Sequence, residues 1–452
     1  MIKEGTAVSA PINEFVRAYS QSGTVRFHMP GHKGRAFHGL EALDITEISG
    51  ADYLYDARGI IGQSEAQTAQ AFGSAATLYS TEGSSQCIKT MLGIVRQNCR
   101  SERMTVLAPR NVHKAFIDAC ILLDLDIKWL YPLQPTTSVC CADITPEQFE
   151  QALSQGGIDC CYVTSPDYLG NFADIGSIAR ICKAANVPLL VDNAHGAYTA
   201  FLKQNVHPVA LGADMCCDSA HKTLPCYTGG AYLHISKGAP EAFVKCAKSV
   251  MSMFGSTSPS YLILQSLDLC SEMLRSGEFS KALETTADMV ESCKQSLLAQ
   301  GWVLCGNEKM KMTVHASRCG YTGTQLADML RAGGIEPEYS DTEYVVLMAG
   351  ISNTQADFDT LTQTMGRIPV KAPLKTDLPI IKPTRRVLSA RQAALQPSYT
   401  ADLEKSLDKV CALTVTSCQP SVPVVVSGEV ISEDIIKILK RYSIFSLNVL
   451  YL

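Results

Sequence analysis

Short apolar runs alternate with amphipathic segments between about residues 70 and 240 of the chain. The apolar runs that predict strands are Met104–Ala108, Asp159–Thr164, Pro188–Val191, Asp214–Cys217 and Ala231–Ile235. Helical periodicity occupies the intervening segments Lys114–Leu123, Pro146–Leu153 and Ile175–Ala185. Fully apolar strands that alternate with helices indicate an α/β fold with a mostly parallel sheet covered on both faces. Because ligands bind beyond the carboxyl ends of such strands, residues directly after each strand are the candidates for function.

The rest of the chain predicts further domains. A helix-rich stretch spans Pro259–Gln300, and a smaller α/β pattern spans Trp302–Met365. A proline-rich linker follows, and the tail from Leu388 has a helical start, a turn near Gln419–Pro423 and an apolar run at Val424–Val426. We therefore expect an N-terminal arm, a large domain, a small α/β domain, a linker and a C-terminal domain, at residues 1–60, 61–300, 301–370, 371–387 and 388–452.

Composition narrows the class of protein. Hydrophobic residues make up 46% and charged residues 18% of the 452 residues, which is typical of a globular protein. The net charge of −5 includes no basic block, so we expect no nucleic-acid partner. No apolar run of about 18 residues predicts a membrane span, and the segment around Glu4 does not resemble a signal peptide.

The 18 cysteines are not spaced like a disulfide framework and fall largely inside apolar runs. We interpret them as small buried hydrophobic residues in a reducing compartment, which predicts a cytoplasmic protein. No Cys-x-x-Cys pair with matching histidines is present, so we expect no metal site.

A lysine motif carries the strongest chemical signal. Ser219-Ala220-His221-Lys222-Thr223-Leu224-Pro225 follows the strand predicted at Ala213–Cys217. A lysine on such a loop can reach the crevice at the sheet edge and form a Schiff base with an aldehyde cofactor. Ser219 and His221 flank the lysine and can hold a cofactor phosphate. The plain alternative for a single lysine is a solvated surface side chain.

An acidic residue upstream favours the cofactor interpretation. Asp192 ends the strand predicted at Pro188–Val191, about thirty residues before Lys222, and opens the sequence Asp192-Asn193-Ala194-His195-Gly196. An aspartate there can keep the pyridine nitrogen of pyridoxal 5′-phosphate (PLP) protonated, so that the ring withdraws electrons from the substrate Cα. The alternative for Asp192 is a helix N-cap.

Two further segments suit the same cofactor. Ser80–Gln86, with Gly83, Ser84 and Ser85, lies between a strand-like run and a helix, and such a turn offers N–H groups and hydroxyls to a phosphate. The segment also reads as a plain helix cap. His113 follows another strand and can stack on a flat ring, although a single histidine more often has a structural role.

Together these elements resemble the fold-type I PLP-dependent decarboxylases of ornithine, lysine and arginine, over nearly the whole chain. The motifs that carry the resemblance are Phe27–Gly34, Ile45–Glu47, Gln63–Gly73, Val163–Pro166, Asp192–Gly196, His221–Pro225, Thr257–Tyr261, Gly334–Glu338 and Val424–Ile431. The implied fold is an aspartate aminotransferase-like large domain with a smaller α/β domain and a C-terminal domain.

The resemblance also implies roles for individual residues. Lys222 carries the Schiff base, Asp192 pairs with the pyridine nitrogen, His113 stacks on the ring, and His195 lies beside the 3-oxygen. The residues implied around the phosphate or the Schiff base are Gly83, Ser84, Ser85, Ser219 and His221. Thr257 and Ser258 reach a neighbouring subunit's phosphate, so a homodimer or a multiple of dimers is implied. The longer family members have an N-terminal receiver-like domain that this chain lacks, so we do not expect their decameric assembly.

The chain departs from the family pattern around the substrate. Asn193 replaces the glutamate of the usual Asp-Glu-Ala-His, and Tyr198 stands where a second histidine is common. Asp167 follows Ser-Pro in place of a hydroxyl residue, and Glu82 occupies a usual asparagine position. The tail's usual Tyr-Pro-Pro-Gly-Ile-Pro is here Cys418–Pro423. These changes leave open which basic amino acid is the substrate.

The predicted reaction is decarboxylation of arginine, lysine or ornithine to CO₂ and the amine of a polyamine pathway, with Lys222 or His221 returning a proton to Cα. Glu429 is the candidate for binding the distal cation of the substrate. One alternative is another PLP reaction, such as transamination, aldol cleavage or β-elimination. A second is a PLP-fold protein that binds or regulates a true decarboxylase.

Overall fold

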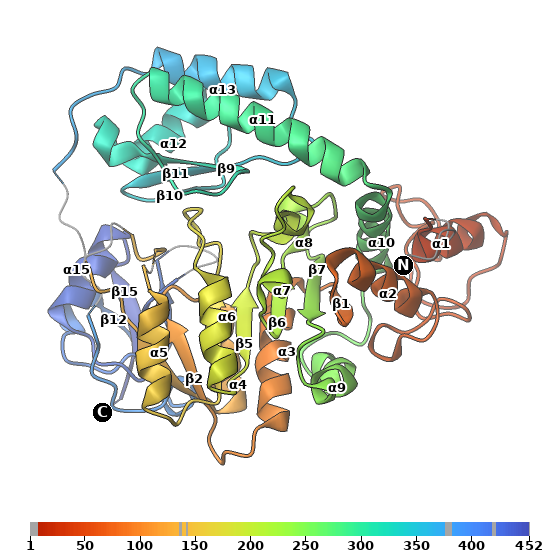
Figure 1. The fold of residues 1–452 in the computed structure, drawn as a ribbon, viewed down its shortest axis with the longest axis horizontal. Helices are drawn as coiled ribbons and strands as arrows, with labels where there is room; N and C mark the ends of the chain where they lie inside the picture. Colours follow the sequence, from red (N-terminus) through yellow and green to blue (C-terminus); the bar gives the residue numbers. More distant parts are fainter. Residues whose placement is uncertain (1–7, 135–137, 142, 376–381, 418–421, 452) are drawn as a thin grey trace. The chain divides into compact units, whose positions relative to one another are not determined.

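The computed structural model describes residues 8–134, 138–141, 143–375, 382–417 and 422–451 (Figure 1). The chain divides into two compact units, each built from two separate stretches. The first unit comprises residues 1–98 and 190–284, and the second comprises residues 99–189 and 285–452. None of the helices among the described residues combines the length and apolar character needed to cross a bilayer.

A seven-stranded sheet forms the large α/β fold, with strand order β1-β7-β6-β5-β4-β2-β3. Strand β2 pairs in parallel with β3 and β4, and β5 pairs in parallel with β6. Strand β7 is antiparallel to both β1 and β6. The sheet is therefore mostly parallel, as the apolar strand pattern predicts, and β7 is antiparallel to both of its neighbours.

The first unit contains β6, the strand that leads into the lysine motif, and the strands beside it. Its elements are α1 (Pro11–Gln21), η1 (Leu54–Asp56), α2 (Ile60–Phe72), β1 (Ala76–Ser80), α3 (Gly83–Asn98), β5 (Leu189–Asp192), η2 (Ala197–Phe201), α7 (Pro208–Leu211), β6 (Met215–Asp218), α8 (Ala220–Thr223), β7 (Ala231–Ile235), α9 (Glu241–Ser252) and α10 (Tyr261–Ser276). Helix α3 packs on β6 and β7, and α2 packs on β1. Every residue of β5, β6 and β7 is buried, so these strands form the core of the unit.

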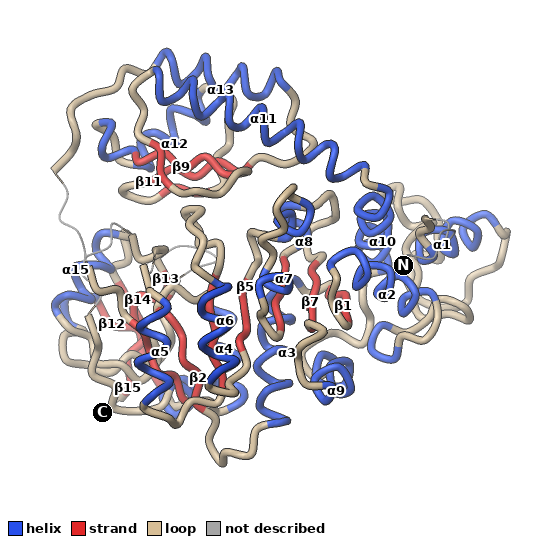
Figure 2. The backbone as a smooth tube through the Cα atoms, in the orientation of Figure 1, coloured by secondary structure: helices blue, strands red, loops and turns tan. Residues whose placement is uncertain are grey.

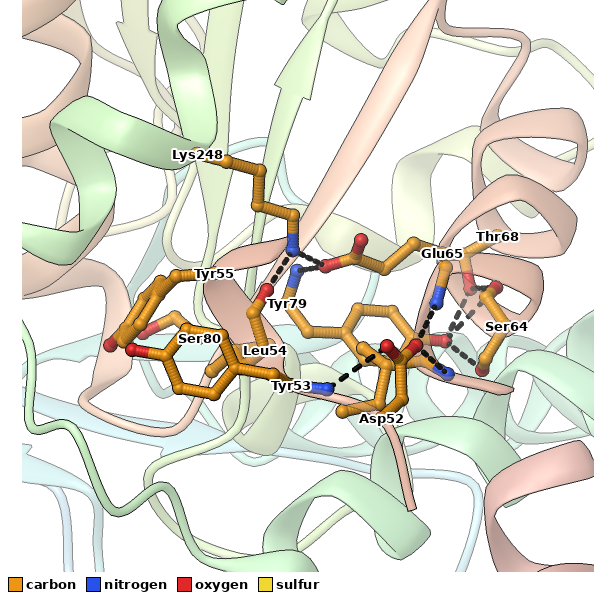
Figure 3. Close-up of polar contacts among 12 residues, drawn as sticks. Asp52, Tyr53, Leu54, Tyr55, Ser64, Glu65, Thr68, Tyr79, Ser80 and Lys248 are labelled. Atoms are coloured by element: carbon orange, nitrogen blue, oxygen red, sulfur yellow. Dashed lines mark hydrogen bonds and ion pairs between the residues drawn. The ribbon is translucent and has the colours of Figure 1, made fainter. Parts of the chain in front are cut away.

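Polar contacts tie the N-terminal part of this unit to its helices (Figure 3). Lys248 of α9 donates from Nζ to Glu65 of α2 at 2.5 Å and to the carbonyl of Leu54 at 2.6 Å. The same Glu65 oxygen accepts the amide of Tyr79 in β1 at 2.8 Å. Burial raises the pKa of Glu65, while Lys248 and the Tyr79 amide act against this shift. One buried carboxylate thus joins α2, α9 and β1.

The second unit holds the other half of the large fold and two smaller parts. Its elements are β2 (Thr105–Pro109), α4 (Lys114–Leu123), β3 (Asp126–Leu130), α5 (Pro146–Ser154), β4 (Cys160–Thr164), α6 (Ile175–Ala184), β8 (Leu304–Cys305), β9 (Lys311–His315), η3 (Ala316–Cys319), α12 (Gly323–Ala332), β10 (Tyr339–Ser340), β11 (Tyr344–Met348), α13 (Gln355–Arg367), α14 (Ala390–Ala394), β12 (Ser398–Asp402), η4 (Leu403–Lys405), β13 (Val415–Thr416), β14 (Pro423–Val425), α15 (Glu433–Arg441) and β15 (Ser446–Leu450). Helix α11 (Glu278–Ala299) begins in the first unit and continues in the second.

A four-stranded antiparallel sheet, in the order β10-β11-β9-β8, forms the smaller α/β part of the second unit. Helix α12 packs on β11, and α11 and α13 lie side by side (Figure 2). The C-terminal segment adds the two-stranded pairs β12-β15 and β13-β14. One hydrophobic cluster contains Val346 of β11, Leu439 of α15 and Val449 of β15, so this segment shares its core with the small sheet.

The local sequence patterns predict most of these elements. The predicted helix Lys114–Leu123 and strand Ala231–Ile235 are confirmed with their bounds, and the other strand predictions named above differ by one residue at one or both ends. Strand β3 was not predicted, because its alternation of Asp126, Lys128 and apolar residues is not apolar throughout. Residues 418–421 of the predicted Pro-rich turn lie outside the described residues, and the domain boundaries remain a prediction.

Candidate active site

The lysine motif lies at the carboxyl end of β6, inside the first unit. Lys222 is the third residue of the single-turn helix α8, which begins two residues after β6 ends at Asp218. Its Nζ lies 3.0 Å from Nε2 of His195, a residue in the turn after β5. Because β5 and β6 are parallel neighbours, both side chains leave the same edge of the sheet. The structure therefore brings together two of the predicted site residues.

Asp192 is the last residue of β5 and is 2% exposed. Its Oδ1 accepts the amide of Ala194 at 3.2 Å and the thiol of Cys217 at 3.7 Å. Burial raises the pKa of the Cys217 thiol, and Asp192 adds to that shift, so the thiol keeps its proton. The alternative role of Asp192 as a helix N-cap is wrong, because the N-cap of the next helical turn is Gly196. A buried carboxylate at this edge can hold a proton on a ligand nitrogen.

The loop between β1 and α3 meets the lysine motif through two hydroxyls. Ser219 Oγ lies 2.7 Å from Ser84 Oγ, in the first turn of the sixteen-residue helix α3. Gly83 has φ of +71° and donates its amide to the carbonyl of Gly229, so a residue with a side chain would be strained there. A Cβ on Gly83 would meet nothing within 4 Å. This helix start has hydroxyls and open space for an anion, and Ser85 is its third residue.

The remaining predicted residues of the first unit are His221, Thr257 and Ser258, and Thr223 belongs to the same lysine motif as His221. His221 donates from Nδ1 to the carbonyl of Gly230 at 2.9 Å. Thr223, next to Lys222, has a buried hydroxyl without a hydrogen-bond partner among the described residues. Thr257 and Ser258 are exposed on the segment between α9 and α10.

His113 and Glu429 belong to the second unit. His113 is the N-cap of α4, where its Nδ1 accepts the amide of Ala115 at 3.1 Å, so the ring has a definite orientation. Glu429 is buried, and its two carboxylate oxygens accept from Arg110 at 2.9 and 2.8 Å. A substrate cation would have to compete with Arg110 for this carboxylate.

Pattern analysis missed a set of buried polar residues behind the lysine motif. Asn193 donates from Nδ2 to Asp218 at 2.6 Å, and His207 and His234 both contact the other oxygen of Asp218. The position of Asp218 directly before Ser219 was a signal that could have marked it. The two histidines lie 11 and 16 residues from Asp218, and no local pattern pairs them with it.

The site residues of the first unit fit PLP by their chemistry. The Lys222 amine can take an aldehyde, the Asp192 carboxylate can hold a pyridine proton, and the hydroxyls of Ser84 and Ser219 can bind a phosphate. The unpartnered hydroxyl of Thr223 is consistent with a ligand beside Lys222. One unit of the structure thus contains a nucleophilic amine, a carboxylate for the pyridine nitrogen and hydroxyls for a phosphate.

Comparison with known families gives the same class. Structures of fold-type I enzymes share the fold, and the model of the Orn/Lys/Arg decarboxylase major domain matches residues 10–313. The chain belongs to the Orn/Lys/Arg decarboxylase family.

Individual relatives cover nearly the whole chain. An arginine decarboxylase of Halalkalibacterium halodurans is 27% identical over 458 residues, which cover 94% of this chain and 91% of that protein. An arginine decarboxylase of Bacillus subtilis is 26% identical over 460 residues, with the same two coverages. The crystal structure of a lysine decarboxylase of Francisella novicida superposes with a TM-score of 0.82 at 15% identity, covering 98% of this chain and 81% of that one. At that identity the structural match shows the fold alone.

Proposed function

We propose that the chain is a PLP-dependent decarboxylase of a basic amino acid. The observation that carries the proposal is the Lys222–His195 contact at 3.0 Å, at the sheet edge where Asp192 ends the neighbouring strand. Membership of the Orn/Lys/Arg decarboxylase family supports the reaction class. The relatives named arginine decarboxylase cover more than nine-tenths of both chains, so arginine is the first substrate to test.

When bound, PLP would supply an aldehyde for the substrate amine and a ring that accepts the electron pair left as CO₂ departs. Lys222 would hold the cofactor through its Nζ and give it up to the substrate amine. Asp192 would keep a proton on the pyridine nitrogen, since a buried carboxylate gains most from a charge-assisted hydrogen bond. Its place at the end of the fully buried strand β5 makes that position rigid.

Two parts of the chain would position the rest of the cofactor. Ser84, Ser85 and Ser219 would bind the phosphate at the start of α3, where the first amides lack intrahelical acceptors. Gly83 keeps that approach open. The family resemblance assigns His113 to the ring of the cofactor, and the hydrogen bond from the Ala115 amide fixes the orientation of this histidine.

Lys222 is the proton donor that the geometry favours. His221 donates its Nδ1 proton to the Gly230 carbonyl, so it could give a proton from Nε2 only when its ring is cationic. The Lys222 ammonium has three protons and lies beside a His195 nitrogen that can accept one. Lys222 would therefore return the proton to the substrate Cα, with His195 holding it in place.

The test is incubation of PLP-loaded protein with arginine, lysine and ornithine, scoring CO₂ and the matching amine. We expect one of the three to yield equal amounts of both products. A keto acid in place of CO₂ would show transamination instead. Bound PLP without any product from the three amino acids would favour a binding or regulatory protein.

Borohydride reduction, followed by peptide mapping, tests the lysine separately. We expect the cofactor on Lys222 and no label after Lys222→Ala. The matched control is Lys237→Ala, because Lys237 also follows a strand of the same sheet but is exposed after the antiparallel β7. Label on any other lysine in the wild type would contradict the assignment.

We also propose a homodimer or a multiple of dimers. The N-terminal segment exposes large apolar side chains, with Phe27 at 93% and Phe37 at 84%. Where such apolar groups form a contiguous patch, they mark a surface that another chain covers. Thr257 and Ser258, which the family resemblance assigns to a neighbouring subunit's phosphate, are exposed as that role requires.

A further inference from the structure

A completely buried carboxylate lies directly behind the candidate site. Asp218, the last residue of β6, is 0% exposed. Its Oδ1 accepts from Nδ2 of Asn193 at 2.6 Å, and its Oδ2 faces Nε2 of His207 at 3.0 Å and Nε2 of His234 at 3.1 Å. Three side chains from three separate segments of the chain thus converge on one carboxylate.

The hydrogen bonds on the far sides of the two rings place their protons. His207 Nδ1 accepts the amide of Val209, so the ring proton is on Nε2 and points at Asp218. His234 Nδ1 lies 2.8 Å from the hydroxyl of Thr77, which can donate to it. Both rings can therefore donate an Nε2–H to Asp218.

The surroundings of Asp218 favour its ionised form. Burial by itself raises the pKa of Asp218, but the interactions with His207 and His234 outweigh burial and hold the pKa below its ordinary value. The Nε2 atom of His207, Sγ of Cys216 and a carboxylate oxygen of Asp218 all lie within 4.8 Å of one another, as in a metal site. The proton on His207 Nε2 occupies the position of a metal bond, so we interpret the group as a hydrogen-bond network.

Asn193 connects this carboxylate to the turn that carries Asp192 and His195. Its amide donates to the carbonyl of Cys217 at 2.9 Å, and its carbonyl accepts the amide of Gly196 at 2.8 Å. With its side chain on Asp218, Asn193 is held at three points. The path of the turn, and with it the place of His195 beside Lys222, depends on these bonds.

In the sequence, Asp218 is followed directly by Ser219, whose hydroxyl contacts the hydroxyl of Ser84. The carbonyl of Ser219 accepts the backbone amide of Lys222 at 3.0 Å. We propose that Asn193 and Asp218 are a matched pair of positioning residues, which fixes the turn of Asp192 and His195 against the loop of Ser219 and Lys222. This inference rests on the proposed function, because it assigns those two segments to opposite ends of one cofactor.

Charge explains why asparagine stands at this position. The Orn/Lys/Arg decarboxylase family usually has glutamate directly after the aspartate that corresponds to Asp192. In this chain a carboxylate at position 193 would face the ionised Asp218 inside the core, and two like charges there repel strongly. Asparagine donates a hydrogen bond and adds no charge, so the pair has one negative charge shared by three donors.

A swap of the pair tests the inference. Asn193→Asp alone places two carboxylates together, and we expect PLP affinity to fall about 10- to 100-fold, with a change in the absorbance spectrum of bound cofactor. Asp218→Asn alone can keep a hydrogen bond if Asn193 reverses its amide, so a loss of only a few-fold is expected. The double variant Asn193→Asp/Asp218→Asn restores one donor and one acceptor. It should recover PLP affinity and the spectrum to within about threefold of wild type.

The matched control is Asn353→Asp, which makes the same change beside the carboxylate of Asp357 at the protein surface. It should leave PLP affinity unchanged, because solvent screens the new charge. A double variant no better than Asn193→Asp would overturn the pairing. So would an Asn193→Asp variant that loses apo-protein thermal stability but keeps wild-type PLP affinity and spectrum. Failure of wild-type protein to label Lys222 would instead remove the proposed function, independently of the swap.

Discussion

Asp192 is the residue whose surroundings most restrict its chemistry. It is nearly inaccessible to solvent at the end of a buried strand, with a backbone amide and a protonated thiol on one of its oxygens. A carboxylate buried in this way needs close hydrogen-bond donors. If the pyridine nitrogen of PLP is one of them, each group stabilises the charge of the other.

We predict that Asp192→Asn lowers turnover on the order of 10²–10³-fold, since a charge-assisted contact in a dry site is worth a few kcal/mol and each ~1.4 kcal/mol is tenfold. PLP should still bind through Lys222 and the phosphate loop. Steady-state decarboxylation and cofactor absorbance measure the two effects. Near-wild-type turnover at full PLP occupancy would remove Asp192 from the catalytic residues.

At the scale of elements, a buried ion pair joins the end of β2 to the C-terminal segment. The guanidinium of Arg110 donates to both oxygens of Glu429 and to the carbonyl of Val424, and it stacks over Trp129 at 4.7 Å. The amide of Val426 also donates to Glu429. Arg110 lies three residues before His113, so the pair also anchors the loop that carries this histidine.

We predict that Glu429→Gln destabilises the protein by roughly 3–5 kcal/mol, because it leaves the buried Arg110 without a counter-charge. Chemical denaturation measures this loss. The double variant Arg110→Met/Glu429→Leu, which removes both charges, should be less damaging than the single change. A Glu429→Gln variant of unchanged stability but strongly raised KM would instead support the substrate-binding role predicted from the sequence.

A second carboxylate links helices and confers pH dependence. Asp268 of α10 accepts the amides of Ile12 and Asn13 at the start of α1 and the hydroxyl of Ser64 in α2. Burial is the largest influence and raises the pKa of Asp268 to about 6, against the lowering effect of these hydrogen bonds. The folded protein therefore retains a proton on Asp268 over a pH range in which the unfolded chain has lost it.

The stabilising contribution of Asp268 is complete below its unfolded pKa of 3.8 and declines as pH rises to about 6. We predict that Asp268→Asn removes a decline of about 3 kcal/mol in unfolding free energy between these pH values. Urea denaturation at several pH values, relative to wild type, measures the difference. Glu278→Gln, at an exposed position, should keep the wild-type slope, and an unchanged slope in Asp268→Asn would contradict the prediction.

At the scale of the whole molecule, the exposed apolar side chains near the N-terminus bear on assembly. If a second copy covers Phe27, Phe27→Glu should raise the dimer dissociation constant on the order of 10²-fold, since burial of such a side chain contributes about 2–3 kcal/mol. Light scattering and sedimentation equilibrium over a dilution series test this. Phe445→Glu, at a side chain 67% exposed elsewhere, is the control. A fully active wild-type monomer at nanomolar concentration would contradict the dimer.

The sequence by itself determined the local elements and the order of the site segments. Apolar runs and helical periodicity are local, so β7 and α4 could be predicted with their bounds. The lysine motif after β6 and the aspartate at the end of β5 were also visible, because an α/β fold places functional groups at strand ends.

Only the tertiary structure decided which polar groups meet. Asn193 and Asp218 are 25 residues apart, and Arg110 and Glu429 are 319 apart, and no periodicity encodes such pairs. The sequence indicated Glu429 as a candidate for binding the substrate cation, and only the fold shows that Arg110 lies against its carboxylate. The antiparallel direction of β7 was equally hidden, because a buried strand is apolar throughout in either direction. Side-chain partners and strand direction arise from chain packing, in which distant segments exclude water together.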